Sequence, residues 1–235
     1  METKYRYVIP NGVTFVSLAA GFTAILAAAT GNLIWSGVLI LTSYILDLCD
    51  GALARRLKAG SEFGLQLDSL TDIVSLGTAP AVLAFFYLQQ AGITGWWLWP
   101  LVILFPLAGA YRLARFNLLP PKTGQVDSVG LTISTAGAII PLAVLSNLST
   151  PGGFVPPILL APLMIVLCLL MVSRIPFPSL GQVLSRRRLN YLYLALIGTT
   201  LFWLQWPVVT TWFVFTGGYL GVSLARAGYL TVSNR

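Results

Sequence analysis

Residues 33–56 read LIWSGVLILTSYILDLCDGALARR, a mostly apolar run that ends in two acids and a pair of arginines. A helix needs about 20 predominantly apolar residues to cross the hydrocarbon core of a bilayer. Similar runs recur along the whole chain of 235 residues, which is 57% hydrophobic and only 9% charged, against roughly 25% charged in an ordinary soluble domain. The sequence therefore predicts an all-α, polytopic membrane protein.

Hydropathy and turn residues divide the chain into about eight spans. Short connectors rich in Gly, Pro, Asn and Ser separate the apolar runs. We expect a transmembrane helical bundle of six core helices plus two, with spans at residues 9–28, 33–56, 64–89, 95–116, 129–147, 154–173, 189–204 and 207–226. The last two are open to a second interpretation, in which residues 189–226 form one span and an interfacial piece.

The basic residues test this assignment, because they were not used to build it. With eight spans, all 14 Lys and Arg residues fall on one side of the membrane, and the opposite connectors contain none. Cytoplasmic loops carry an excess of Lys and Arg, so both termini are predicted to be cytoplasmic. The net charge of +7 thus reflects topology, and we expect no nucleic-acid partner. The tryptophans gather near the opposite side, as in an aromatic belt: Trp35, Trp96, Trp97, Trp99, Trp203 and Trp206.

Four of the seven acidic residues lie inside spans two and three or at their cytoplasmic ends. Carboxylates at membrane depth are costly and usually functional. Asp47 and Asp50 are spaced i, i+3, and Gly64, Asp68 and Asp72 repeat every four residues, so each helix presents two carboxylates on one face. Small residues beside them allow the two helices to approach closely. We expect the four carboxylates to converge where these faces meet.

The ligand types narrow the chemistry of this tetrad. The sequence has no histidine, and we interpret its two cysteines, Cys49 and Cys168, as packing residues within apolar segments. Carboxylates alone form a hard ligand set, suited to Mg²⁺, Mn²⁺ or Ca²⁺ rather than zinc. Spacing leaves three interpretations open: acids neutralised by nearby basic residues at positions 55, 56 and 58, a cation- or proton-coupled transporter, or a phosphotransferase in which two metals bridge a diphosphate.

Residues 47–72 carry a more specific pattern. They read DLCDGALAR, then eight residues, then GLQLDSLTD, and match all eight fixed positions of DxxDGxxAR(x8)GxxxDxxxD. This resembles the signature of the CDP-alcohol phosphotransferase family and favours the third interpretation. The resemblance implies that residues 1–235 form a single transmembrane domain of that family, in which a lipid is transferred from a CDP-linked donor to an alcohol and CMP is released.

The resemblance also implies roles for individual residues. Two divalent cations, Mg²⁺ or Mn²⁺, would be held by Asp47, Asp50, Asp68 and Asp72, with Asp72 as the general base. Donor-binding residues would be Asn11, Thr14, Gly51, Ala54, Arg55 and Gly64. Glycine suits a site where a nucleotide approaches the backbone, and arginine can pair with phosphate oxygens. For Asn11 and Thr14 an N-terminal helix cap is the alternative.

Three further segments are similar to the phosphatidylserine synthase branch of the family: residues 67–81, 111–117 and 171–179. That likeness implies L-serine as acceptor and CDP-diacylglycerol, or its archaeal ether analogue, as donor. It also implies a multi-pass protein of the cell membrane with the active site at the cytoplasmic face. The apolar later spans are expected to face membrane lipid and to form a homodimer surface.

The chain departs from the branch at a few positions. Ser17 stands where asparagine is usual and Leu76 where phenylalanine is common. Residues 130–134 read GLTIS, whereas the branch usually has Gly-Leu-Pro-x-Pro. The last departure bears on the acceptor if that stretch shapes its pocket.

The acceptor can also be considered from its charge. The carboxylate of serine requires a cation, and Arg112 and Arg115 lie about one helical turn apart at the cytoplasmic end of span four, with Asn117 adjacent. We interpret these three as acceptor-binding residues, with Arg115 preferred. The alternative is that both arginines only anchor the span at the lipid headgroups. A phosphorylated acceptor, glycerol 3-phosphate or inositol phosphate, would suit two arginines as well.

Overall fold

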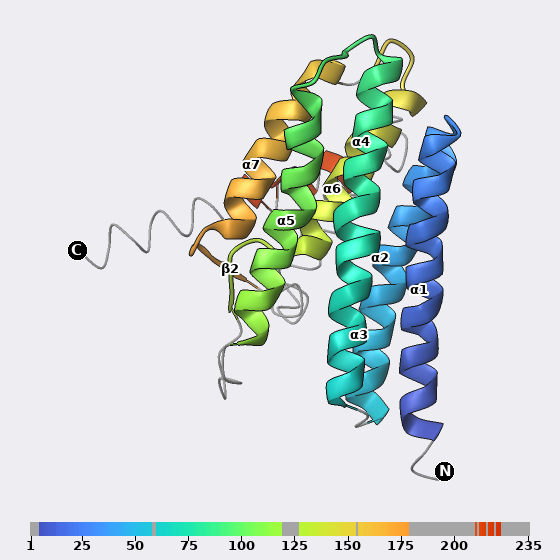
Figure 1. Ribbon diagram of the computed structural model, residues 1–235, viewed down its shortest axis with the longest axis vertical. Coiled ribbons are helices and arrows are strands. Elements are labelled where there is room, and N and C mark those ends of the chain that lie inside the picture. The colour runs from blue at the N-terminus through green and yellow to red at the C-terminus, as the bar shows by residue number, and fades with distance from the viewer. Residues whose placement is uncertain are drawn as a thin grey trace, which may run out of the picture.

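The computed structural model describes residues 5–57, 60–118, 127–153, 155–178, 210, 212–214, 216–218 and 220–221. The helices lie side by side along the long axis of the molecule (Figure 1). In chain order they are α1 (Tyr5–Ala29), α2 (Leu33–Leu57), α3 (Glu62–Asp72), α4 (Ala79–Gln90), α5 (Leu98–Asn117), α6 (Ile133–Ser149) and α7 (Leu160–Val172). A π-helical turn, η1 (Ile73–Thr78), joins α3 to α4, and a 3₁₀ turn, η2 (Pro157–Leu159), precedes α7.

The helical character predicted from the sequence is confirmed. Within the described part of the chain, three helices are long and apolar enough to cross a membrane: Tyr7–Ala29, Leu33–Ala54 and Glu62–Gln90. The next three predicted spans coincide with α5, with α6 and with η2 and α7 together. The span predicted at 189–204 lies outside the described residues, and so does most of the span predicted at 207–226.

One short sheet was not predicted. Strands β1 (Asp127–Val129) and β2 (Pro176–Pro178) pair antiparallel, with Ser128 opposite Phe177. Three-residue strands are too short to show the alternating pattern by which strands are recognised in a sequence. The pair joins the segment before α6 to the segment after α7.

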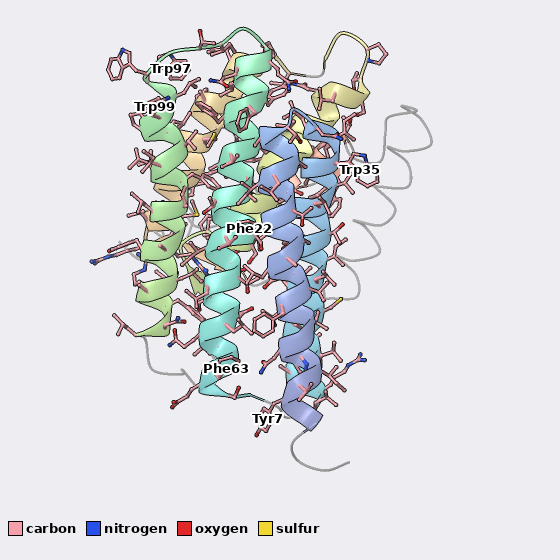
Figure 2. The ribbon with its side chains drawn as sticks, turned by 45° about the vertical axis from the view of Figure 1, so that its right-hand side comes forward. Tyr7, Phe22, Trp35, Phe63, Trp97 and Trp99 are labelled. Carbon is pink, nitrogen blue, oxygen red and sulfur yellow. The ribbon has the colours of Figure 1, made fainter. Side chains whose placement is uncertain are left out.

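Large apolar side chains cover the outside of the bundle, as expected for helices in contact with lipid. Phe22 is 58% exposed and Trp99 is 65% exposed. Figure 2 shows Trp35, Trp97 and Trp99 near one end of the helices, and Tyr7 at the other end. The three labelled tryptophans agree with the predicted aromatic belt, whereas Trp203 and Trp206 lie outside the described residues.

The π-helical turn interrupts the third span just after Asp72. Ala79 donates its backbone N–H to the carbonyl of Val74, five residues back, and the Thr78 hydroxyl donates to the Ile73 carbonyl over the same spacing. Pro80 has no N–H, so it cannot donate to the carbonyl of Leu76 as an α-helix would require. The wider turn accommodates this missing bond, and π-turns of this kind are frequent at functional sites.

Two glycines allow neighbouring helices to approach this turn closely. Gly21 of α1 packs against Ser75, and Gly137 of α6 packs against the backbone of Leu76. A Cβ atom on Gly137 would lie 2.9 Å from the carbonyl carbon of Leu76 and 3.0 Å from its Cα. Both α1 and α6 therefore pack closely against η1, directly beyond the end of α3.

Gly137→Ala is expected to destabilise the folded protein. Because the added methyl group meets rigid backbone, the cost should be about 1–3 kcal/mol, the usual range for overpacking a core. The midpoint of thermal unfolding in detergent measures it. Gly12→Ala is the matched control, since no heavy atom lies within 4 Å of its Cβ position. Equal midpoints for the two variants would contradict the proposed tight contact.

Candidate active site

A cavity of about 470 Å³ lies among five helices near the predicted cytoplasmic end. Its volume is in the range of small-molecule sites. It is lined from α1, α2, α3, α5 and α6, together with the short turn before α3. The Arg55 side chain lies outside the described residues, and of the other sequence-predicted site residues all but Arg115 line the cavity: Asn11, Thr14, Asp47, Asp50, Gly51, Ala54, Gly64, Asp68, Asp72, Arg112 and Asn117.

The four aspartates of α2 and α3 line one cavity, as their spacing predicted, but the expected close approach of the two helices is wrong, because both pack mainly against other helices, α1 among them. One carboxylate oxygen from each of Asp47, Asp50 and Asp68 lies within 4.8 Å of the others. Asp72 lines the same cavity one helical turn deeper and is only 6% exposed. Within the described part of the chain, the Oδ1 atom of Asp72 is buried and has no hydrogen-bond partner.

This geometry fits divalent cations. Mg²⁺ and Mn²⁺ prefer oxygen ligands, and a buried carboxylate oxygen without a donor is costly unless a cation or a proton compensates it. The converging oxygens of Asp47, Asp50 and Asp68 and the orphaned oxygen of Asp72 supply that ligand set. The alternative that nearby basic residues neutralise the aspartates does not hold for Arg56, because its side chain is exposed and does not line the cavity.

Thr14 fixes the orientation of one of these carboxylates. Its hydroxyl donates to the Oδ2 atom of Asp50 at 2.6 Å, and it also lies 3.1 Å from the carbonyl of Pro10. The alternative interpretation of Asn11 and Thr14 as a helix cap is wrong, because α1 begins at Tyr5 and both residues lie inside it.

Ser17, one turn further along α1, also has a structural partner. Its hydroxyl is 2.7 Å from that of Ser43 on α2, and its carbonyl accepts a hydrogen bond from Ser75 of η1 at 3.2 Å. All three serines are fully buried. Serine at position 17, where the branch usually has asparagine, therefore forms hydrogen bonds that connect α1 to α2 and to η1.

Gly64 lies where α3 begins, and its missing side chain serves two purposes. Ser61 caps the helix by accepting from the Gly64 N–H at 3.0 Å. A Cβ atom on Gly64 would come within 3.1 Å of that serine oxygen and 3.3 Å of the Asn11 side-chain oxygen. Glycine thus allows α1 to approach α3 and keeps this side of the cavity open. The Arg55 side chain lies outside the described residues.

The opposite wall is formed by α5 and carries positive charge. Arg112 is only 6% exposed, and its guanidinium carbon lies 5.6 Å from the ring centroid of Phe116, a cation–π distance. Its charge interacts with the Asp72 carboxylate. Asn117, at the end of the helix, donates from Nδ2 to the Ser69 hydroxyl of α3 at 3.1 Å. This wall places a buried cation across the cavity from the tetrad.

Arg115 is placed differently from the sequence-based expectation. Its guanidinium donates to three backbone carbonyls, those of Val129, Val172 and Ser173, at 2.9–3.0 Å, and it does not line the cavity. Ser134, on the first turn of α6, does line it. Sequence reasoning marked Ser134 only as part of a departure from the usual motif.

Comparison with known proteins agrees with the geometry. Residues 7–222 match the family described as CDP-alcohol phosphatidyltransferase. The chain is 31% identical over 235 residues to the CDP-diacylglycerol–serine O-phosphatidyltransferase of Helicobacter pylori strain 26695, covering 99% of this chain and 96% of the relative.

Two further relatives match a smaller share of the chain. A Bacillus subtilis protein with the same name is 33% identical over 174 residues, covering 72% of this chain and 89% of the relative. The archaetidylserine synthase of Methanothermobacter thermautotrophicus is 31% identical over 174 residues, covering 72% and 69%. The family match covers most of the chain and includes every aspartate of the tetrad, so the chain belongs to the CDP-alcohol phosphatidyltransferase family.

Proposed function

We propose that this membrane enzyme is a CDP-diacylglycerol–serine O-phosphatidyltransferase. One observation carries the proposal: a single cavity holds the four signature aspartates and, across from them, the buried guanidinium of Arg112. The first feature suits a diphosphate held by metal ions, and the second suits an acceptor with a carboxylate. The names of the relatives from bacteria and archaea support serine as that acceptor.

The reaction divides among the residues of the cavity. Two divalent cations, held by Asp47, Asp50, Asp68 and Asp72, would neutralise the diphosphate oxygens of the donor. Asp72 accepts the proton of the serine hydroxyl, and the hydroxyl oxygen forms a bond to the phosphorus that carries diacylglycerol. The bond from that phosphorus to the bridging oxygen breaks, and CMP leaves with the electron pair.

The two sides of the cavity have different tasks in this proposal. Asn11, Gly51, Ala54 and Gly64, with Arg55, belong to the donor side, where small residues admit the nucleotide. Arg112 and Asn117 belong to the acceptor side, where the guanidinium binds the serine carboxylate. The charge of Asp72 interacts with those of Asp47 and Asp68 and with that of Arg112, which suits a residue that takes a proton from one substrate during attack on the other.

The placement in the membrane is also part of the proposal. We place the protein in the cell membrane as a single domain of residues 1–235 with eight spans, both termini and the cavity on the cytoplasmic side, and a homodimer as the assembly. The position of every Lys and Arg on one side supports this orientation. The donor is water-insoluble and the acceptor soluble, so a cavity at the interface would reach both.

A parallel assay of acceptors tests the function. Purified protein in detergent, with Mg²⁺ or Mn²⁺ and CDP-diacylglycerol, is offered L-serine, glycerol 3-phosphate or inositol phosphate, and released CMP is measured. We expect CMP release when L-serine is the acceptor and none with either phosphorylated acceptor. Release with a phosphorylated acceptor but not with serine would replace the proposed acceptor, and no release with any would contradict the proposed donor. An ether-linked CDP donor, run alongside, shows which tail is used.

Thr14→Val is expected to weaken metal binding. The substitution keeps the shape of the side chain but removes the hydrogen bond that orients Asp50. Losing a partner of a metal ligand typically costs 10–100-fold in metal affinity or activity, so the Mn²⁺ concentration for half-maximal activity should rise by about tenfold or more. Thr14→Ser, which retains the hydroxyl, should behave as wild type. Equal metal requirements in Thr14→Val and wild type would contradict this role.

A further inference from the structure

We propose that Ser134 contacts the acceptor and determines its binding, and that Arg115 positions Ser134 rather than touching the acceptor itself. The inference rests on the function proposed above and extends it to residues in a segment where this chain departs from the usual motif of its branch. Three features of the described residues support it: the place of Ser134 in the cavity, its unused hydroxyl, and the hydrogen bonds that hold the segment before it.

Ser134 is on the acceptor side of the cavity. Among the described residues that line the cavity, Ser134 comes from α6. The helix α5 contributes Arg112, Leu113, Phe116 and Asn117. The donor-side residues come instead from α1, α2 and the start of α3. Ile133, the neighbour of Ser134, packs against Gly109 of α5, so we place the first turn of α6 beside the α5 wall that a group bound at Arg112 would contact.

The hydroxyl of Ser134 is available to a ligand. Its neighbours use theirs locally: Thr132 caps α6 by accepting from the Thr135 N–H at 3.3 Å, and the two threonine hydroxyls are 2.7 Å apart. Within the described residues, no hydrogen bond joins the Ser134 hydroxyl to another group, and the side chain is only half-buried because it borders the cavity. A hydroxyl can donate to the carboxylate of an amino acid or accept from its ammonium group.

Arg115 holds the segment that leads to Ser134. Its three hydrogen bonds run to Val129, at the end of β1, and to Val172 and Ser173, at the end of α7. The last carbonyls of a helix have no intrahelical partners, and a cation there is also favoured by the helix dipole. Arg115 thereby fastens α5 to the end of α7 and to the strand that precedes α6.

The backbone at Gly130 and Leu131, which leads to Ser134, is fixed as well. Gly130 has a φ of +81°, which favours glycine, and its N–H donates to the Ile175 carbonyl at 2.9 Å. Leu131 donates to the Leu170 carbonyl at 3.1 Å. A Cβ atom on Gly130 would lie 2.8 Å from an Arg115 nitrogen. The start of α6 is therefore set by contacts to α5, α7 and β2, and a change at Arg115 reaches the cavity through this segment.

The test compares Michaelis constants for the two substrates. Ser134→Ala removes the hydroxyl, and Ser134→Pro restores the residue usual in the branch, which the first turn of a helix tolerates. Loss of one hydrogen bond to a charged ligand should raise the KM for serine about tenfold in Ser134→Ala, with kcat and the KM for the donor within about twofold. Thr42→Ala is the control, because that exposed hydroxyl bonds only to its own helix, at Val38. An unchanged KM for serine, or an equal rise for both substrates, would overturn the contact.

A double-mutant cycle tests the positioning role. Arg115→Gln should raise the KM for serine in the same direction as Ser134→Ala, and Arg115→Lys should restore part of the loss. If Arg115 acts through Ser134, then combining Arg115→Gln with Ser134→Ala should add little to the KM for serine beyond the single change, whereas independent sites give additive effects. Additive effects would overturn the positioning role. Absence of serine-dependent CMP release in the wild type would instead remove the proposed function, so the two failures are distinguishable.

Discussion

Asp72→Asn is expected to reduce turnover by about 10³-fold or more. General-base catalysis contributes about 10²–10⁴-fold to such a reaction, and an amide can neither accept the proton of the acceptor nor supply the charge of a metal ligand. The Asp72 side chain is buried, so a base from solution could take over the role of its Oδ1 atom only by entering the cavity. CMP release at saturating serine and donor measures the effect.

Glu62→Gln is the matched control for Asp72→Asn. It removes the same charge from the same helix, α3, but Glu62 is exposed in the first turn and does not line the cavity. Its turnover should stay within about twofold of wild type, as is usual for a surface substitution away from special features. Full activity in Asp72→Asn would remove the general-base role and leave the aspartate, at most, as a metal ligand.

Arg112→Gln is expected to raise the KM for serine by at least about 30-fold. Removing one partner of a buried, charged hydrogen-bonded pair costs 2–5 kcal/mol or more, and 1.4 kcal/mol corresponds to tenfold. The guanidinium is buried beside Phe116 and near Asp72, so water does not screen it as it would at the surface. Initial rates at varied serine concentration, with donor held at saturation, give the constant.

Arg56→Gln controls for the loss of a positive charge near the cytoplasmic end. Arg56 is exposed, and its replacement should leave both Michaelis constants near their wild-type values. A rise in the KM for CDP-diacylglycerol in Arg112→Gln, with the constant for serine unchanged, would show that the guanidinium binds the donor diphosphate. Arg112 would then be a donor-binding residue rather than an acceptor-binding one.

The convergence of the tetrad could be predicted because it depends on local geometry. Asp47 and Asp50 share a face of one helix, Asp68 and Asp72 share a face of the next, and a short connector makes the two helices antiparallel neighbours. Helical periodicity and one turn therefore predict the cluster, whereas the structure adds its depth and the cavity that lies among the carboxylates in place of a close α2–α3 contact. The helical character of the first six predicted segments could be predicted for a similar reason, since hydropathy acts on each segment separately.

The partners of Thr14 and Arg115 could not be predicted. Thr14 meets Asp50 from 36 positions away, and Arg115 meets Ser173 from 58 positions away. A threonine in the first span and an arginine near a cytoplasmic end have several roles in membrane helices, and only the packing of distant segments selects one. Ser134 was missed because its role follows from where the Arg115 contacts place the start of α6.

The turn η1 contains one residue more than an α-helical path would use, and the wider turn absorbs it. An α-helix advances by about 100° per residue, so if the same residues 73–78 took α-helical spacing, all of α4 would rotate by about that angle relative to the aspartates. Leu83 and Leu88, which are fully buried, would then leave the core while Asp68 and Asp72 kept their place. The wide turn therefore keeps the packing half of the span aligned with its catalytic half, and deleting one residue within it should leave both faces in place, because the remaining residues suffice for an α-helical turn.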